Sequence, residues 1–338
     1  MASSAITSTP TSFINKKDAG LSSFSTQPSF SIRNSKKRVA RKIVSVMAPQ
    51  QSERKPSTTG SVKTAMTMTE KILARASEKP QKSSARMQRS GTVKRLSLYL
   101  TTIYSRPDER ANRNVDILRE FCIEQNIKYF YDITDLGNFK ANPDYKGVCH
   151  VALAQEGHCR PGEVLLGTDS HTCTAGAFGQ FATGIGNTDA GFVLGTGKLL
   201  LKVPPTLRFV MDGEMPNYLL AKDLILQIIG EISMSGATYK SMEFVGTTVE
   251  SLTMEERMTL CNMVVEAGGK NGVVPADSTT YKYLEDKTSL PYEPVYSDEQ
   301  ARFLSEYRFD VSKLEPLVAK PHSPDNRALA KRMQRCEN

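Results

Sequence analysis

Apolar segments of strand length alternate with segments of helical periodicity from Arg110 onward, and this alternation limits the fold more than any other feature of the chain. Strands are expected at residues 128–132, 147–154, 163–167, 203–211 and 242–245. Helices are expected at residues 66–76, 113–125, 219–232 and 253–267. Strands that alternate with helices of these lengths predict α/β layers around a parallel or mixed sheet. A chain of 338 residues is long enough for about two domains.

Two of the expected helices carry start and stop signals. Thr253 and Glu256 have the spacing of a capping box, and Gly268 follows the last residue of that helix. Thr67 or Thr69 is expected to cap the first helix. These signals place both ends of the helix at 253–267 and the start of the helix at 66–76.

The positive charge of the chain is confined to its first third. Residues 1–110 hold 21 Lys or Arg and six acids, a net charge of +15, whereas residues 111–338 have a net charge of −7. The folded part is therefore mildly acidic, and we expect no nucleic-acid partner. No segment approaches the roughly 20 continuous apolar residues that cross a bilayer, so no membrane partner is expected either.

The first 52 residues have the composition of an organelle transit peptide. They hold twelve Ser, eight Lys or Arg and one acid. The Met-Ala start followed by Ser and Thr favours a plastid, so the chloroplast stroma is the expected location; an ordinary disordered tail is the alternative. Residues 53–108 are interpreted as a linker followed by an atypical basic segment. Within it, residues 79–106 hold seven bases and no acid, which indicates either a docking segment or, as we favour, sequence foreign to the surrounding domain.

The six cysteines include no C-x-x-C pair, which favours free thiols in a reducing compartment over a disulfide framework. Three of them lie close in sequence to three histidines and offer the ligand types of zinc: Cys149, His150, His158, Cys159, His171 and Cys173. Their spacing matches no common zinc finger or ribbon, so a zinc site is disfavoured.

Polar residues follow directly after the strand expected at 163–167. Asp169, Ser170 and His171 would then lie at the carboxyl edge of a sheet, where open α/β folds bind ligands. Because histidine titrates near neutral pH and a carboxylate fixes its tautomer, Asp169 and His171 can orient a polar substrate and share a proton. A polar turn with a merely hydrogen-bonded His171 is the alternative.

The segment that follows is rich in glycine, since residues 167–197 hold eight of the 22 glycines. It contains neither a G-x-G-x-x-G pattern at a strand–helix junction nor a Walker lysine, so nucleotide binding is disfavoured. Close helix packing and approach of the backbone to a ligand explain the glycines better. Further along, Asn262 and Glu266 are four residues apart on one expected helix and share a face, which is either a solvated surface or part of a site.

Four segments together resemble the large-subunit family of 3-isopropylmalate dehydratases, in the aconitase superfamily. The most specific is LLGTDSHTCTAGAFGQFATGIGNTD at 165–189. It is supported by VCHVALAQEGHCRPG at 148–162, LCNMVVEAGGKNGV at 260–273 and FDVSKLEPLVAKPHSPDN at 309–326. The resemblance covers roughly residues 62–80 and 109–330, and residues 331–338 are expected to be a tail outside the family pattern.

The resemblance implies aconitase-like three-layer α/β/α domains around a [4Fe-4S] cluster, one iron of which acts as a Lewis acid. It implies a heterodimer with a small subunit, and interconversion of 2-isopropylmalate and 3-isopropylmalate in leucine biosynthesis. By the same resemblance His150, Asp169 and His171 act on the substrate and its departing hydroxyl, and Ser170 binds substrate. Asn262 matches an amide beside the cluster that binds substrate, and Glu266 matches a catalytic carboxylate near the hydroxyl.

The sequence also departs from that family pattern. The family's cluster cysteines lie in an Ile-Gly-Ser-Cys-Thr motif and a later Cys-x-x-Cys, and the sequence stops before both, with Cys336 alone. The family's Asp-His dipeptide is missing from 79–106. We therefore expect an incomplete aconitase-like fold, no metal ligand among these residues, and a chain that neither holds the cluster nor turns over by itself. The alternatives are a non-catalytic paralogue that binds the small subunit or a full-length partner, and a homoaconitase-like or methylthioalkylmalate isomerase subunit.

Overall fold

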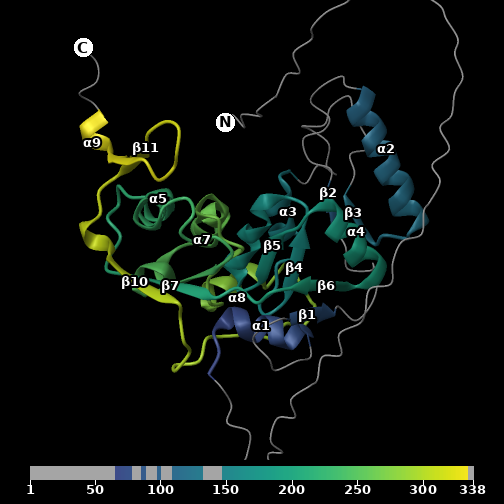
Figure 1. Ribbon diagram of the computed structural model, residues 1–338, viewed down its shortest axis with the longest axis horizontal. Coiled ribbons are helices and arrows are strands. Elements are labelled where there is room, and N and C mark those ends of the chain that lie inside the picture. Colours follow the sequence, from purple (N-terminus) through teal and green to yellow (C-terminus); the bar gives the residue numbers. More distant parts are fainter. Residues whose placement is uncertain (1–64, 78–84, 89–96, 100–108, 132–146, 334–338) are drawn as a thin grey trace, which may run out of the picture. The chain divides into compact units, whose positions relative to one another are not determined.

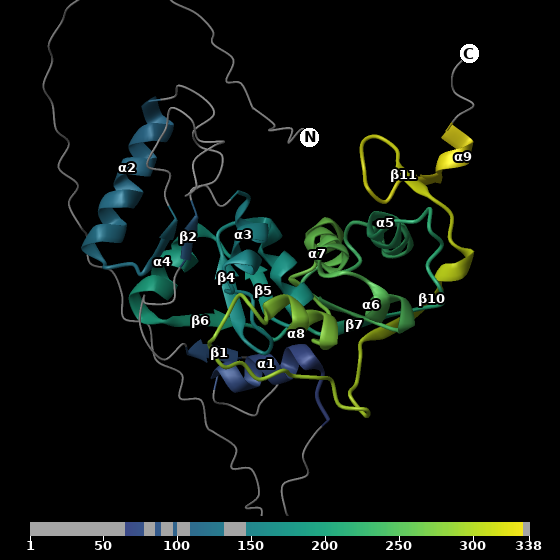
Figure 2. The same cartoon turned by 180° about the vertical axis from the view of Figure 1, so that it is seen from behind.

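Four parallel strands pair in the order β10-β7-β8-β9 and form the largest sheet of the described chain. The computed structural model describes residues 65–77, 85–88, 97–99, 109–131 and 147–333 (Figure 1). The four strands are β7 (Thr206–Asp212), β8 (Ser241–Val245), β9 (Asn271–Val273) and β10 (Ser305–Asp310). Two helices that follow these strands, α5 (Ala221–Ile232) and α7 (Met254–Asn262), lie side by side in both views (Figures 1 and 2).

The main hydrophobic core lies between this sheet and those helices. Phe209 of β7 and Phe244 of β8 are fully buried, with ring centroids 5.7 Å apart, and the ring of Tyr307 on β10 stacks on Phe209 at 5.1 Å. Ile225 and Ile228 of α5 are fully buried in the same cluster. Burial of each such side chain contributes roughly 1.5–3 kcal/mol of transfer free energy, so this core holds the sheet and helices in place.

β4 (Val164–Gly167) and β5 (Phe181–Gly184) form a second parallel pair, and Asp169, Ser170 and His171 follow the end of β4. The 3₁₀ helix η4 (Ser170–Phe178) connects the two strands. In both views α3 (Cys149–Gln155) and α1 (Met68–Ser77) lie on opposite sides of this pair (Figures 1 and 2).

The remaining strands form three small pairs: β1 (Ala85–Gln88) with β6 (Lys198–Leu201), β2 (Ser97–Tyr99) with β3 (Tyr129–Tyr131), and β11 (Leu317–Ala319) with β12 (Arg327–Leu329). The remaining helices are α2 (Glu109–Glu124), α4 (Asn187–Thr196), α6 (Thr247–Ser251), η5 (Met263–Ala267), α8 (Ser278–Leu284), η6 (Val311–Lys313) and α9 (Ala330–Met333). No helix in the described ranges is long and apolar enough to cross a membrane.

Most predicted elements are confirmed, and so is the α/β class with parallel sheets. The strand expected at 147–154 is wrong, because α3 occupies it. Ala152 and Ala154 favour a helix and are both buried, and Gly157, with φ +71°, ends the turn that follows. Only one face of this apolar segment is buried, so its composition resembles a buried strand while its packing is that of a helix.

The expected helix at 253–267 begins as predicted but changes type. The Thr253–Glu256 capping box is present, and Gly268, with φ +78°, ends the segment. In between, α7 gives way to the 3₁₀ helix η5 after Asn262. At the first helix Thr67 makes the capping contacts with Glu70, so Thr67 rather than Thr69 is the cap.

Several predictions fall on residues outside the described ranges. These are the transit peptide at 1–52, residues 53–64 of the linker that follows it, most of the basic segment at 79–106, and residues 334–338 of the tail. Two short parts of the basic segment are described. They form β1 and β2, which pair with β6 and β3.

Candidate active site

Asp169 is the centre of the candidate site, and it also starts η4. The chain leaves β4 at Gly167, and the Asp169 carboxylate accepts a hydrogen bond of 2.7 Å from the backbone N–H of His171. The Thr172 hydroxyl donates a hydrogen bond of 2.6 Å to the carbonyl oxygen of Asp169. Aspartate is a preferred N-cap because its oxygen satisfies an unpaired N–H of the first turn. The carboxylate is therefore held at the edge of the sheet, with about half of its surface exposed.

His150 reaches the same carboxylate from α3. Its Nε2 lies 2.9 Å from Oδ1 of Asp169, and its side chain is 12% exposed. Burial lowers the pKa of His150 and outweighs the Asp169 carboxylate, which favours the charged imidazole. Because a carboxylate only accepts, Nε2 carries the proton in this pair, and Nδ1 of the neutral ring is left as an acceptor.

His171 lies between two carboxylates. Its Nδ1 is 3.7 Å from Asp169 Oδ1, and its Nε2 is 3.5 Å from Oε1 of Glu266 on η5. The Ser170 hydroxyl lies 3.0 Å from the same Nδ1. The ring centroids of His150 and His171 are 6.3 Å apart. His150, Asp169, His171 and Glu266 thus form one connected, partly exposed set of side chains, the histidine–carboxylate group, which can take up and deliver protons.

Asn262 joins this group through the η4 backbone. Its amide donates to the Thr174 hydroxyl at 2.9 Å, and that hydroxyl donates to the carbonyl oxygen of His171 at 2.7 Å. Glu266 contacts His171 directly. The residues expected to share one helical face lie on α7 and η5, and both contact η4. The structure therefore brings together all six residues that the sequence singled out: His150, Asp169, Ser170, His171, Asn262 and Glu266.

His158 lies apart from this group. Its Nε2 is 2.9 Å from the Tyr131 hydroxyl, and its ring packs edge-on against Tyr129. Burial, assisted by the Arg160 charge, lowers the pKa of His158. This histidine links β3 to the loop after α3, which is a structural contact.

The described cysteines do not fit an iron–sulfur cluster. No three His, Cys, Asp or Glu side chains within the described ranges are arranged to hold a metal ion. Burial raises the pKa of Cys159 and of Cys173 to about 12 and raises that of Cys261 well above its ordinary value. A cluster needs thiolates that converge on one point, and these three thiols lie in the apolar core without such an arrangement.

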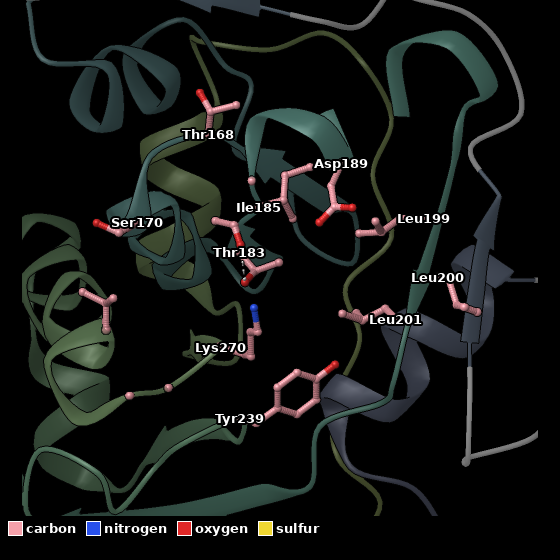
Figure 3. Close-up of a pocket in the computed structure, with 15 residues that line it drawn as sticks. Thr168, Ser170, Thr183, Ile185, Asp189, Leu199, Leu200, Leu201, Tyr239 and Lys270 are labelled. Carbon is pink, nitrogen blue, oxygen red and sulfur yellow. Dashed lines mark hydrogen bonds between the residues drawn. The ribbon is translucent and has the colours of Figure 1, made fainter. Parts of the chain in front are cut away.

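A cavity of about 560 Å³ adjoins the group (Figure 3). Ser170 and Thr168 line one side of it, and Lys270 and Tyr239 line another. Sequence reasoning missed Lys270, because a single lysine after two glycines gives no motif. The only available signal was its position in the 260–273 segment.

Comparison with known proteins gives a consistent picture. A sequence model of the aconitase family (aconitate hydratase) matches residues 54–337. The chloroplastic 3-isopropylmalate dehydratase large subunit of Arabidopsis thaliana is 67% identical over 94% of this chain and 68% of its own length. The 3-isopropylmalate dehydratase large subunit 1 of Methanopyrus kandleri is 47% identical over 64% of this chain and 49% of its own length. The probable methanogen homoaconitase large subunit of Methanosarcina mazei is 45% identical over 62% of this chain and 51% of its own length.

The chain thus spans about two thirds of the Arabidopsis protein and about half of the two archaeal proteins. The matched segments include the strand end, the 3₁₀ helix and the glycine-rich turn that assemble the histidine–carboxylate group. On this similarity the chain belongs to the aconitase family, among the relatives of the 3-isopropylmalate dehydratase large subunits.

Proposed function

We propose that the chain is a large subunit of 3-isopropylmalate dehydratase, a hydro-lyase that interconverts 2-isopropylmalate and 3-isopropylmalate by loss and return of water. The observation that carries the proposal is the connected group of His150, Asp169, His171 and Glu266. The high identity to the Arabidopsis large subunit supports the substrate assignment.

Each member of this group has a proposed task. Loss of water from a malate requires a base for the proton on the carbon next to the hydroxyl-bearing one, a proton for the departing hydroxyl, and donors for the substrate carboxylates. Glu266 is 42% exposed on its side chain and 3.5 Å from His171, so it is placed to exchange a proton with that imidazole beside the bound substrate. Asp169 orients both imidazoles, and neutral His150 offers Nδ1 as an acceptor. Ser170 and the Asn262 amide supply hydrogen bonds around the substrate.

The [4Fe-4S] cluster of the family would supply Lewis-acid chemistry at the substrate hydroxyl. The described thiols do not fit this cluster, because no three ligand side chains among the described residues converge on one point. Turnover that uses a cluster therefore depends on ligands other than the described cysteines.

We also propose a small-subunit partner and a location in the chloroplast stroma. The partner follows from the large-subunit name of the relatives, and the location from the chloroplastic Arabidopsis relative together with the composition of residues 1–52. A homoaconitase-like subunit is the second candidate, because the Methanosarcina relative with that name is nearly as similar as the archaeal dehydratase.

The test is to combine the full chain with a plastid small subunit under anaerobic conditions with iron and sulfide. Conversion of 2-isopropylmalate and of homocitrate is then measured for the unaltered complex and for Glu266→Gln. We expect the unaltered complex to convert 2-isopropylmalate, and we expect the rate to fall at least about 100-fold in Glu266→Gln. Preference for homocitrate would favour the second candidate. A stable complex without turnover of either compound would contradict the proposal and favour a non-catalytic paralogue.

A further inference from the structure

The cavity beside the histidine–carboxylate group has a mixed lining. Its volume of about 560 Å³ lies in the range of small-molecule sites. Apolar side chains come from the loop after β5 and from β6: Ile185, Leu199, Leu200 and Leu201. Among the described residues that line it, Lys270 is the one cation and Asp189 the one anion. Such a lining suits a ligand with both an alkyl group and a negative charge.

Lys270 is held in place at the edge of the large sheet. Its backbone N–H donates to the carbonyl oxygen of Lys240 at 2.8 Å, and β9 begins at the next residue. Its Nζ lies 5.5 Å from the ring centroid of Tyr239, whose hydroxyl donates to the carbonyl oxygen of Lys202 at 3.2 Å. The aromatic face supports the cation without neutralising its charge.

The Lys270 ammonium has no ion-pair partner within the described ranges, although it is half-buried. Figure 3 shows its Nζ pointing into the cavity toward Thr183, while Asp189 points into the same space from the opposite side. An ammonium with three donors in a concave site is suited to bind a carboxylate. A carboxylate bound there would complete the pairing that the protein's own side chains leave open.

We propose that Lys270 is a substrate-binding residue that receives one carboxylate of a dicarboxylate in this cavity. Ser170 lines the same cavity and hydrogen-bonds His171, so the ligand extends from Lys270 toward the histidine–carboxylate group. The apolar wall takes the alkyl group. Asp189 repels a further negative charge, so an alkyl dicarboxylate binds better than a tricarboxylate. The identity of the ligand as an alkylmalate rests on the proposed function, whereas the carboxylate site does not.

The test uses the full chain and succinate, a dicarboxylate that a dehydratase does not convert. Amine labelling followed by mass spectrometry measures the reactivity of Lys270 and of Lys282, an exposed lysine on α8, with and without succinate. We expect succinate to protect Lys270 and not Lys282. Equal labelling of Lys270 with and without succinate overturns the proposal.

Variants give the second readout. Calorimetry should show succinate binding weakened about tenfold or more in Lys270→Met, largely restored in Lys270→Arg and unchanged in Lys282→Met. Unchanged binding in Lys270→Met, or loss of binding in Lys282→Met to the same degree, contradicts the assignment.

Asp189→Asn should improve binding of tricarballylate, a tricarboxylate, relative to succinate. An unchanged ratio of the two affinities would contradict the role of Asp189.

The two proposals fail in different ways. If the complex with the small subunit does not convert 2-isopropylmalate while succinate still protects Lys270, the dehydratase function fails and the carboxylate site stands. If the complex converts 2-isopropylmalate with an unchanged KM in Lys270→Met, the carboxylate site fails and the function stands.

Discussion

Nε2 of His150 lies 2.9 Å from Oδ1 of Asp169, and the same carboxylate oxygen accepts the backbone N–H of His171 at 2.7 Å. One side chain therefore caps η4 and orients a histidine from α3. The candidate chemistry and the local backbone geometry depend on the same atom.

Because Asp169 has both roles, its replacement by Asn and its replacement by Ala should differ in their effect on stability. Asn keeps a capping oxygen but loses the charge, whereas Ala loses both. We expect both variants to lose at least about 100-fold in turnover by the complex, and Ala alone to lose about 1 kcal/mol of unfolding free energy. Activity assays and denaturant unfolding check this. Full activity in Asp169→Asn would show that the carboxylate charge is not needed.

Stability is expected to decrease in acid because two half-buried histidines, His150 and His158, lie in surroundings that disfavour the charged imidazole. Burial lowers the pKa of His150 and of His158 below the ordinary 6.5. As the pH falls below 6.5, the unfolded chain binds protons on these histidines that the folded chain does not yet bind. The free energy of unfolding therefore decreases. Above 6.5 both states hold neutral rings and this contribution is fully present.

The double variant His150→Gln, His158→Gln should show a smaller loss of stability between pH 6.5 and pH 5 than the unaltered chain. Urea unfolding at several pH values measures it. His322 is exposed, so His322→Gln is the matched control. An identical pH dependence in the double variant would contradict the assignment.

Close packing of the η4 backbone predicts that replacing Gly176 lowers the free energy of unfolding strongly. A Cβ on Gly176 would lie 1.6 Å from the carbonyl oxygen of Gly272, so Gly176→Ala must separate η4 from β9. We expect a loss of roughly 3 kcal/mol or more. Gly191 lies inside α4, where a Cβ meets nothing within 4 Å, and Gly191→Ala should stabilise the chain by about 0.5–1 kcal/mol. Thermal unfolding of both variants checks the difference, and equal effects would contradict it.

The iron content of the purified chain tests whether its cysteines hold an iron–sulfur cluster. After anaerobic incubation with iron and sulfide, the purified chain alone is expected to hold no stoichiometric iron, because no three ligand side chains of the described residues converge on one point. Iron and sulfide analysis with absorption spectroscopy measures this. About four irons per chain would contradict the prediction, and Cys→Ser variants would then identify the ligands.

Local sequence signals determined most of the elements. The Thr253–Glu256 box and Gly268 marked the ends of one helical segment, because capping is a contact between near neighbours in the chain. The sequence indicates Asp169 and His171 together because both follow directly after the strand that ends at Gly167, and the structure adds the capping contact between them. The apolar segment at 147–154 was assigned wrongly, because strand and helix differ there in which faces are buried.

Tertiary packing alone decided which distant groups meet. Contact between Glu266 and His171 requires η5 to pack against η4, and contact between His150 and Asp169 requires α3 to lie at the end of β4. The environment of Lys270 likewise depends on β6, on the loop after β5 and on Tyr239, which are far apart in the chain. Sequence by itself determined the helix caps, the α/β class and the residues able to do chemistry. Their distances, their burial and the lowered pKa of His150 came from packing, because desolvation and charge pairing exist only once separate elements are brought together.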